Sequence, residues 1–140
     1  MSEIKQELVS KIREQAKNRC GYCLVPQKLV SYKLEIEHIF PRALGGSNEE
    51  NNLWLACRQC NLSKRIKTHG FDTVTFERIK LFNPREQIWS EHFKFSVEET
   101  EIIGKTPCGR ATVSALQLNS DLQRTAREFW KLTGIFPPKD

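Results

Sequence analysis

Four cysteines arranged as two C-x-x-C pairs constrain this chain more than any other feature. The first pair is Cys20 and Cys23, the second is Cys57 and Cys60, and 33 residues (24–56) separate them. Each pair offers two thiolates from one turn, which is the ligand pattern of a tetrahedral zinc site. A disulfide, a redox motif or an iron–sulfur cluster are the alternatives, and the presence of two pairs argues against a redox motif. Four thiolates fill the coordination sphere, so we expect Zn²⁺ to join two distant segments structurally.

The composition favours one soluble domain with a modest core. The chain has 140 residues, of which 39% are hydrophobic and 28% charged. No apolar run is as long as a membrane span, and the polar N-terminus lacks a signal-peptide core, so we expect a cytoplasmic protein without a membrane partner. Thiols stay reduced there, which favours metal ligation over disulfides. The fifth cysteine, Cys108, stands alone and is expected to be an unligated small residue.

Positive charge is concentrated beside the second cysteine pair. The formal net charge is +5, and no acidic residue occurs between Asn51 and Phe71. Such a block favours contact with the phosphates of a nucleic acid, although a solvated helix face has the same composition. The candidate nucleic-acid-binding residues are Arg58, Lys64, Arg65 and Lys67.

Hydrophobic periodicity predicts an α+β chain. Around the cysteine pairs it predicts a strand, a polar loop, a second strand and a helix, preceded by an amphipathic helix. The expected ranges are a helix at 3–19, strands at 34–39 and 53–56, and a helix at 58–68. Further along, residues 93–97 are expected to pair with 102–103 as a hairpin, followed by helices at 110–118 and 120–132, with Ser120 as the N-cap of the last. Trp89, Phe93, Phe129, Trp130 and Phe136 are expected to be core or interface anchors.

A more specific pattern lies between and just after the cysteine pairs. It consists of Glu35-Ile36-Glu37-His38-Ile39-Phe40-Pro41-Arg42, then Gly45-Gly46-Ser47, Asn52-Leu53, and Cys57-Arg58-Gln59-Cys60-Asn61 with Lys64. In residue type, order and spacing this stretch resembles the HNH endonuclease family, in its small bacterial or phage type with a four-cysteine zinc site. The resemblance covers residues 20–68, about a third of the chain. It implies a zinc-stapled ββα-metal (His-Me finger) core at residues 1–70, which begins with the N-terminal helix. Residues 71–140 are then expected to form a mixed, mainly helical extension that packs on this core.

The resemblance also implies roles for individual residues. His38 takes the position of the general base, and histidine titrates near pH ~6.5, so it is largely neutral at neutral pH. Glu37 and Asn61 take the positions of ligands to a catalytic divalent ion, and Asn52 that of a residue whose side chain ties down the loop backbone and so orients His38. Oxygen ligands of this kind favour Mg²⁺ or Mn²⁺. Neighbouring strand residues point to opposite faces, so Glu37 and His38 can face one phosphate only if the strand twists or ends there.

The expected function is therefore a metal-dependent endonuclease that hydrolyses phosphodiester bonds in DNA, leaving 5′-phosphate and 3′-hydroxyl ends. DNA is favoured over RNA only through the resemblance. The alternative is a non-catalytic, zinc-stapled nucleic-acid-binding module, and a third possibility is a zinc-stabilised protein-interaction adaptor. The sequence leaves both a monomer and a homodimer open.

Overall fold

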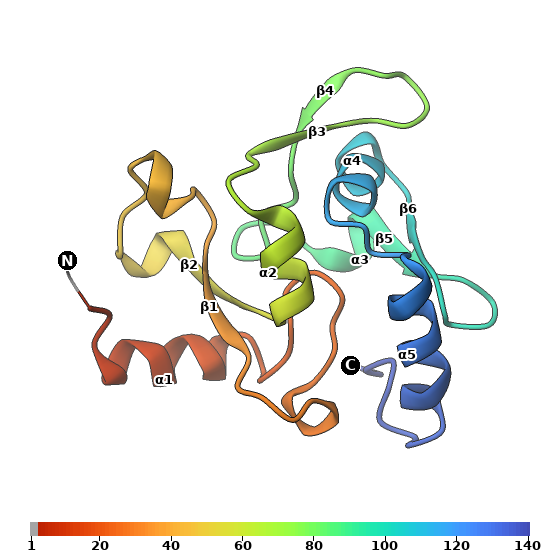
Figure 1. Cartoon of the computed structure of the whole chain (residues 1–140), viewed down its shortest axis with the longest axis horizontal. Coiled ribbons are helices and arrows are strands. Elements are labelled where there is room, and N and C mark those ends of the chain that lie inside the picture. Colours follow the sequence, from red (N-terminus) through yellow and green to blue (C-terminus); the bar gives the residue numbers. More distant parts are fainter. Residues whose placement is uncertain (1–2) are drawn as a thin grey trace.

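Short antiparallel strand pairs alternate with helices in the computed structural model, which describes residues 3–140 (Figure 1). The helices are α1 (Gln6–Gln15), α2 (Arg58–Lys64), α3 (Trp89–His92), α4 (Pro107–Ala115) and α5 (Asp121–Lys131). The strands are β1 (Glu35–His38), β2 (Leu53–Ala56), β3 (His69–Phe71), β4 (Arg78–Lys80), β5 (Phe93–Phe95) and β6 (Ile102–Gly104). They pair as β1 with β2, β3 with β4 and β5 with β6. The predicted α+β class is confirmed.

The first hairpin and the helix after it occur where the hydrophobic pattern predicts them. In the β1–β2 pair, Glu37 lies opposite Trp54 and His38 opposite Leu53. Helix α2 begins directly after Cys57, whose sulfur accepts a hydrogen bond from the backbone N–H of Cys60 at 3.3 Å and so caps the helix. The helix is shorter than the predicted range of 58–68.

The C-terminal half contains one hairpin that the sequence analysis predicted and one that it did not. Strands β5 and β6 form the expected antiparallel pair, whereas the β3–β4 hairpin was not foreseen. Ser120 caps α5 as predicted, since its hydroxyl accepts a hydrogen bond from the N–H of Gln123. Within residues 3–140, no helix is long and apolar enough to cross a membrane.

One buried cluster joins the two halves of the chain. The four paired cysteines belong to the same hydrophobic core as Phe82, Phe93, Leu116 and Leu118. In Figure 1 the C-terminal elements (cyan to blue) accordingly lie beside α2. Of the predicted aromatic anchors, Trp89, Phe93 and Trp130 are in or against this core. Phe136 is buried against Trp130, but Phe129 is 64% exposed.

Candidate metal centre and active site

The four cysteines form one compact cluster, as the sequence predicted. All four side chains are buried, and their sulfur atoms lie within 4.8 Å of one another. The Cys23 and Cys57 sulfurs are 3.7 Å apart. Zinc–sulfur bonds of about 2.3 Å in a tetrahedron place sulfur atoms roughly 3.8 Å apart. The cluster therefore fits a structural zinc site, and Cys108 lies outside it.

The pKa shifts of the cysteine thiols also indicate a metal site. Burial raises the pKa of Cys20, but hydrogen bonds from the other three thiols outweigh it and leave that pKa well below its usual value. Hydrogen bonds to Cys20 in turn raise the pKa of Cys23 and of Cys60. One thiolate is thus favoured at the expense of its neighbours, and a bound cation is what permits all four to ionise.

The turn between Cys20 and Cys23 is fitted closely against the first hairpin. The N–H of Gly21 donates to the Leu55 carbonyl of β2 at 2.9 Å. A Cβ atom at Gly21 would lie 2.4 Å from the Trp54 ring, so only glycine allows this approach. The zinc cluster is thereby fixed to β2 by backbone contact as well as by its ligands.

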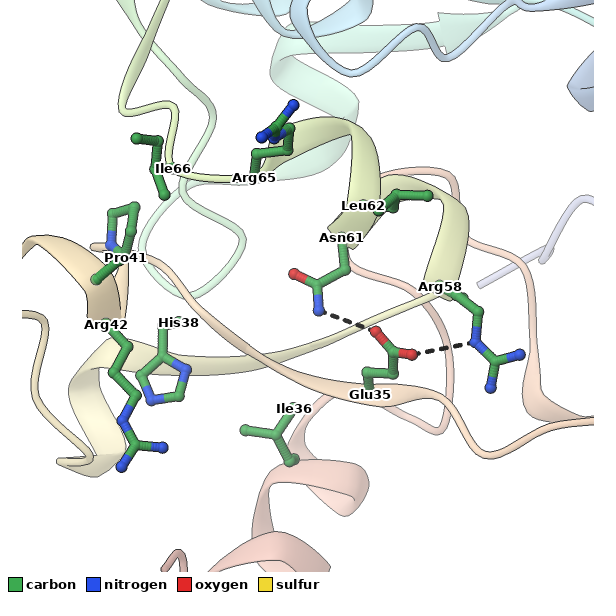
Figure 2. A pocket seen from close by; sticks show the side chains of 11 residues that line it. Glu35, Ile36, His38, Pro41, Arg42, Arg58, Asn61, Leu62, Arg65 and Ile66 are labelled. Atoms are coloured by element: carbon green, nitrogen blue, oxygen red, sulfur yellow. Dashed lines mark hydrogen bonds and ion pairs between the residues drawn. The ribbon is translucent and has the colours of Figure 1, made fainter. Parts of the chain in front are cut away.

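A pocket of about 550 Å³ lies beside the cluster, between β1, α2 and the loop after β1 (Figure 2). It is lined by Glu35, Ile36, His38, Pro41, Arg42, Ala43, Arg58, Asn61, Leu62, Arg65 and Ile66. Glu35 and Ile36 are neighbours on β1 and point to opposite faces, so the pocket spans the edge of this strand. The structure thus brings His38 and Asn61 to one pocket.

The loop that follows His38 is held by Asn52. The Asn52 side chain accepts a hydrogen bond from the Phe40 N–H (2.8 Å) and donates to the carbonyls of Phe40 (3.1 Å) and Ser47 (2.9 Å). The imidazole of His38 contacts the same loop, because its Nε2 lies 2.7 Å from Oδ1 of Asn48.

Glu35 is the carboxylate in contact with Asn61. The Asn61 side-chain amide donates to Oε1 of Glu35 at 3.0 Å, and Nε of Arg58 donates to Oε2 at 3.2 Å (Figure 2). The Arg58 guanidinium also stacks over Tyr32, 4.2 Å from the ring centroid. The sequence motif does not mark Glu35 as a metal ligand, although its position two residues before Glu37 places both on one strand face.

Glu37 differs from the predicted arrangement, because it lies outside this pocket. Its side chain is 1% exposed, with Oε1 2.7 Å from the Lys64 ammonium and Oε2 accepting from the Tyr22 hydroxyl at 2.8 Å. Burial and the Glu37 carboxylate together raise the pKa of Tyr22 well above its usual value. The spacing of residues along β1 and α2 explains this difference. Glu35 and Glu37 share the face of β1 that α2 covers. Asn61 contacts Glu35, and Lys64, three residues further along the helix, contacts Glu37.

The four basic candidates separate into two groups. Arg58 and Arg65 line the pocket, together with Arg42, which the sequence analysis did not select as a binding residue. Lys64 is 2% exposed, and Lys67 donates to the carbonyls of Ser63 and Ala115. Neither lysine lines the pocket, and the Lys64 ammonium contacts Glu37 and two backbone carbonyls.

Comparison with known proteins bears on the same segment. No curated protein and no solved structure matches the chain. Residues 20–66, however, match the model of the family described as HNH endonuclease. The segment that carries the four cysteines, His38, Asn52 and Asn61 thus matches the HNH family, as the resemblance of the sequence predicted.

Proposed function

We propose that this chain is a metal-dependent endonuclease that hydrolyses phosphodiester bonds in DNA. The observation that carries the proposal is the convergence of His38, Asn61 and Glu35 on one pocket, within the segment that matches the HNH model. Strands β1 and β2 with helix α2 then correspond to the ββα-metal core of such an enzyme, held by zinc at Cys20, Cys23, Cys57 and Cys60.

Three arginines give the pocket its affinity for a phosphate backbone. Arg42, Arg58 and Arg65 all line it, and a guanidinium forms paired hydrogen bonds with phosphate oxygens. Binding of this kind releases counterions and therefore weakens steeply as salt rises. These side chains position the substrate and carry no base information.

His38 is the proposed general base, and its hydrogen bond selects the nitrogen that acts. Nε2 faces the carboxamide oxygen of Asn48 at 2.7 Å, and that oxygen only accepts hydrogen bonds. In the neutral ring the proton therefore resides on Nε2, which leaves the Nδ1 lone pair to take a proton from the attacking water. Asn52 supports this arrangement by holding the backbone of the same loop.

Glu35 and Asn61 are the proposed ligands of the catalytic ion, with Glu35 in place of Glu37. Their side chains are in hydrogen-bond contact at 3.0 Å, and turning the carboxamide of Asn61 offers its oxygen beside the carboxylate. Such hard oxygen donors fit Mg²⁺ or Mn²⁺. When bound, the ion stabilises negative charge on the phosphate and on the departing 3′ oxygen. Arg58 keeps the Glu35 carboxylate oriented through Oε2.

The test is cleavage of plasmid DNA with Mg²⁺ or Mn²⁺ by the wild type, by His38→Ala and by His69→Ala. His69 lies on β3 and is not a pocket residue, so His69→Ala is a matched control. We expect nicking by the wild type and the control, and none by His38→Ala, with zinc content and circular dichroism unchanged. Cleavage by His38→Ala at the wild-type rate contradicts the assignment. Salt-dependent DNA binding without any cleavage identifies the non-catalytic module instead.

A further inference from the structure

The ammonium group of Lys64 is buried and has three close acceptors. It lies 2.7 Å from Oε1 of Glu37, 3.1 Å from the carbonyl oxygen of His38 and 3.0 Å from that of Ile39. The ammonium donates hydrogen bonds to the two carbonyls, and its contact with Glu37 is an ion pair. Two of the three are peptide carbonyls at the end of β1, and one belongs to the proposed base itself.

The same contacts continue to the cysteine cluster. Oε2 of Glu37 accepts the hydroxyl hydrogen bond of Tyr22, which lies inside the turn between Cys20 and Cys23 and is 0% exposed. A continuous buried path therefore runs from the zinc turn through Tyr22, Glu37 and Lys64 to the backbone of His38.

Stability alone is a weak reason to keep this ion pair. Two charges lose their hydration when buried, and apolar side chains of similar volume are often equally stabilising or better. At 2% exposure the ammonium of Lys64 also cannot serve as a phosphate contact. Lys64 instead contacts the backbone of His38, and the position of the His38 imidazole determines the cleavage rate in the proposed mechanism.

Opposite sides of this backbone are held by different residues. The backbone carbonyl of Asn52 accepts a hydrogen bond from the Ile39 N–H at 2.9 Å, and the Asn52 side chain accepts one from the Phe40 N–H. Lys64 holds the carbonyls of His38 and Ile39. Together these contacts fix the peptide planes from which the His38 side chain projects.

We propose that Lys64, with Glu37 as its counter-charge and Tyr22 as the link to the zinc turn, is a positioning residue for His38. This inference rests on the proposed function of His38, and it adds a residue that acts through the backbone without touching the substrate. A displacement of about 1 Å in a catalytic group costs on the order of 100-fold in rate.

The test is Lys64→Met in the zinc-loaded chain of 140 residues, read by nuclear magnetic resonance of the imidazoles and by cleavage kinetics. The chain has three histidines, His38, His69 and His92, so their ring signals are readily assigned. We expect the His38 signals to shift and broaden while the other two stay unchanged. We also expect kcat to fall about 10- to 100-fold with KM within about twofold, because substrate contacts remain.

Lys67→Met is the matched control, since Lys67 also donates to two backbone carbonyls, those of Ser63 in α2 and Ala115 in α4, but to none of β1. It is expected to leave the His38 signals at their wild-type positions. If Lys64→Met does not fold, two further variants serve instead. The double variant Glu37→Gln/Lys64→Met removes the carboxylate that would be left unpaired, and Tyr22→Phe removes only one hydroxyl. Both variants are expected to shift the His38 signals.

Unchanged His38 signals and unchanged kcat in a folded, zinc-containing Lys64 variant overturn the inference. If the wild type itself does not cleave DNA, the proposed function fails, but the imidazole signals still decide whether Lys64 positions His38. The two failures are therefore distinguishable.

Discussion

Glu35 and Glu37 lie two residues apart on one face of β1, and their partners differ in exposure and charge. Glu35 meets Asn61 and the exposed Arg58 at a pocket, whereas Glu37 is enclosed with Lys64 and Tyr22. A carboxylate in the first setting is available to a metal ion, and one in the second is committed to a buried pair.

We expect the two carboxylates to respond oppositely to substitution. Glu35→Gln should lower cleavage about 100-fold and change the free energy of unfolding by less than about 1 kcal/mol, since its pair with Arg58 is solvent-exposed. Glu37→Ala should instead lower the free energy of unfolding by about 3–5 kcal/mol, because it leaves the Lys64 charge buried without its partner. Urea unfolding and cleavage rates measure both effects, and a metal-site role for Glu37 would reverse the pattern.

At the scale of elements, α2 ends in a backbone conformation that arginine rarely adopts. Arg65 has φ 52° and ψ −122°, and this residue both ends the helix and lines the pocket. Strain of this kind costs about 1–3 kcal/mol and commonly occurs at functional sites.

We therefore expect Arg65→Gly to raise stability while weakening DNA binding. Relief of strain exceeds the extra chain entropy of glycine, about 0.5–1 kcal/mol, so the net gain is about 1 kcal/mol. Arg65→Ala is the control, because it removes the same charge and keeps the strained conformation. Thermal unfolding and DNA titration compare them. Equal stability of the two variants would show that the backbone at Arg65 is not strained.

The β3–β4 hairpin is joined to α4 by a partly buried ion pair. Asp72 is 0% exposed, and both of its oxygens accept hydrogen bonds from Arg110, at 2.7 and 2.9 Å. These bonds hold the pKa of Asp72 well below its usual range. A carboxyl whose pKa is lower in the folded than in the unfolded protein adds stability above the unfolded value of about 4 and loses it as the pH falls further.

We expect Asp72→Asn to lower the melting temperature near neutral pH and to flatten its decline below about pH 4. Asp121→Asn is the matched control, since Asp121 forms an ion pair with Arg124 but its side chain is 92% exposed. Melting curves between about pH 3 and 7 measure both. If the melting temperature of Asp72→Asn falls below about pH 4 as steeply as that of the wild type, the Asp72–Arg110 ion pair is not the source of this decline.

Periodicity and motif predicted the elements that bury an apolar face, and they did not predict contacts that depend on register. The β1–β2 hairpin, α5 and its Ser120 cap follow from local patterns. The β3–β4 hairpin has no such pattern, and it is placed by the close approach of Gly70 to α4. Likewise, the motif indicated His38 and Asn61. The way α2 lies over β1 determines which of Glu35 and Glu37 faces Asn61. The same packing buries Lys64.

At the scale of the whole molecule, the metal cluster and the C-terminal half share one core. Leu116 and Leu118 pack in the cluster that contains the four cysteines, and Leu118 also accepts a hydrogen bond from the buried Arg127 of α5. Burial lowers the pKa of this guanidinium, and the cysteine thiolates oppose that effect. Helix α5 is therefore linked through Leu118 to the core that contains the four cysteines.

Removal of zinc should consequently unfold more than residues 20–66. Structural zinc contributes about 10–16 kcal/mol of binding free energy in small domains, which is as large as the usual folding stability of about 5–15 kcal/mol. We expect a zinc chelator to abolish amide-exchange protection in α5 together with that in α2, in one transition. Removal of Mg²⁺ alone, with zinc retained, should leave protection intact and stop cleavage. Protection that persists in α5 after zinc loss would instead show that residues 71–140 fold independently of the HNH domain.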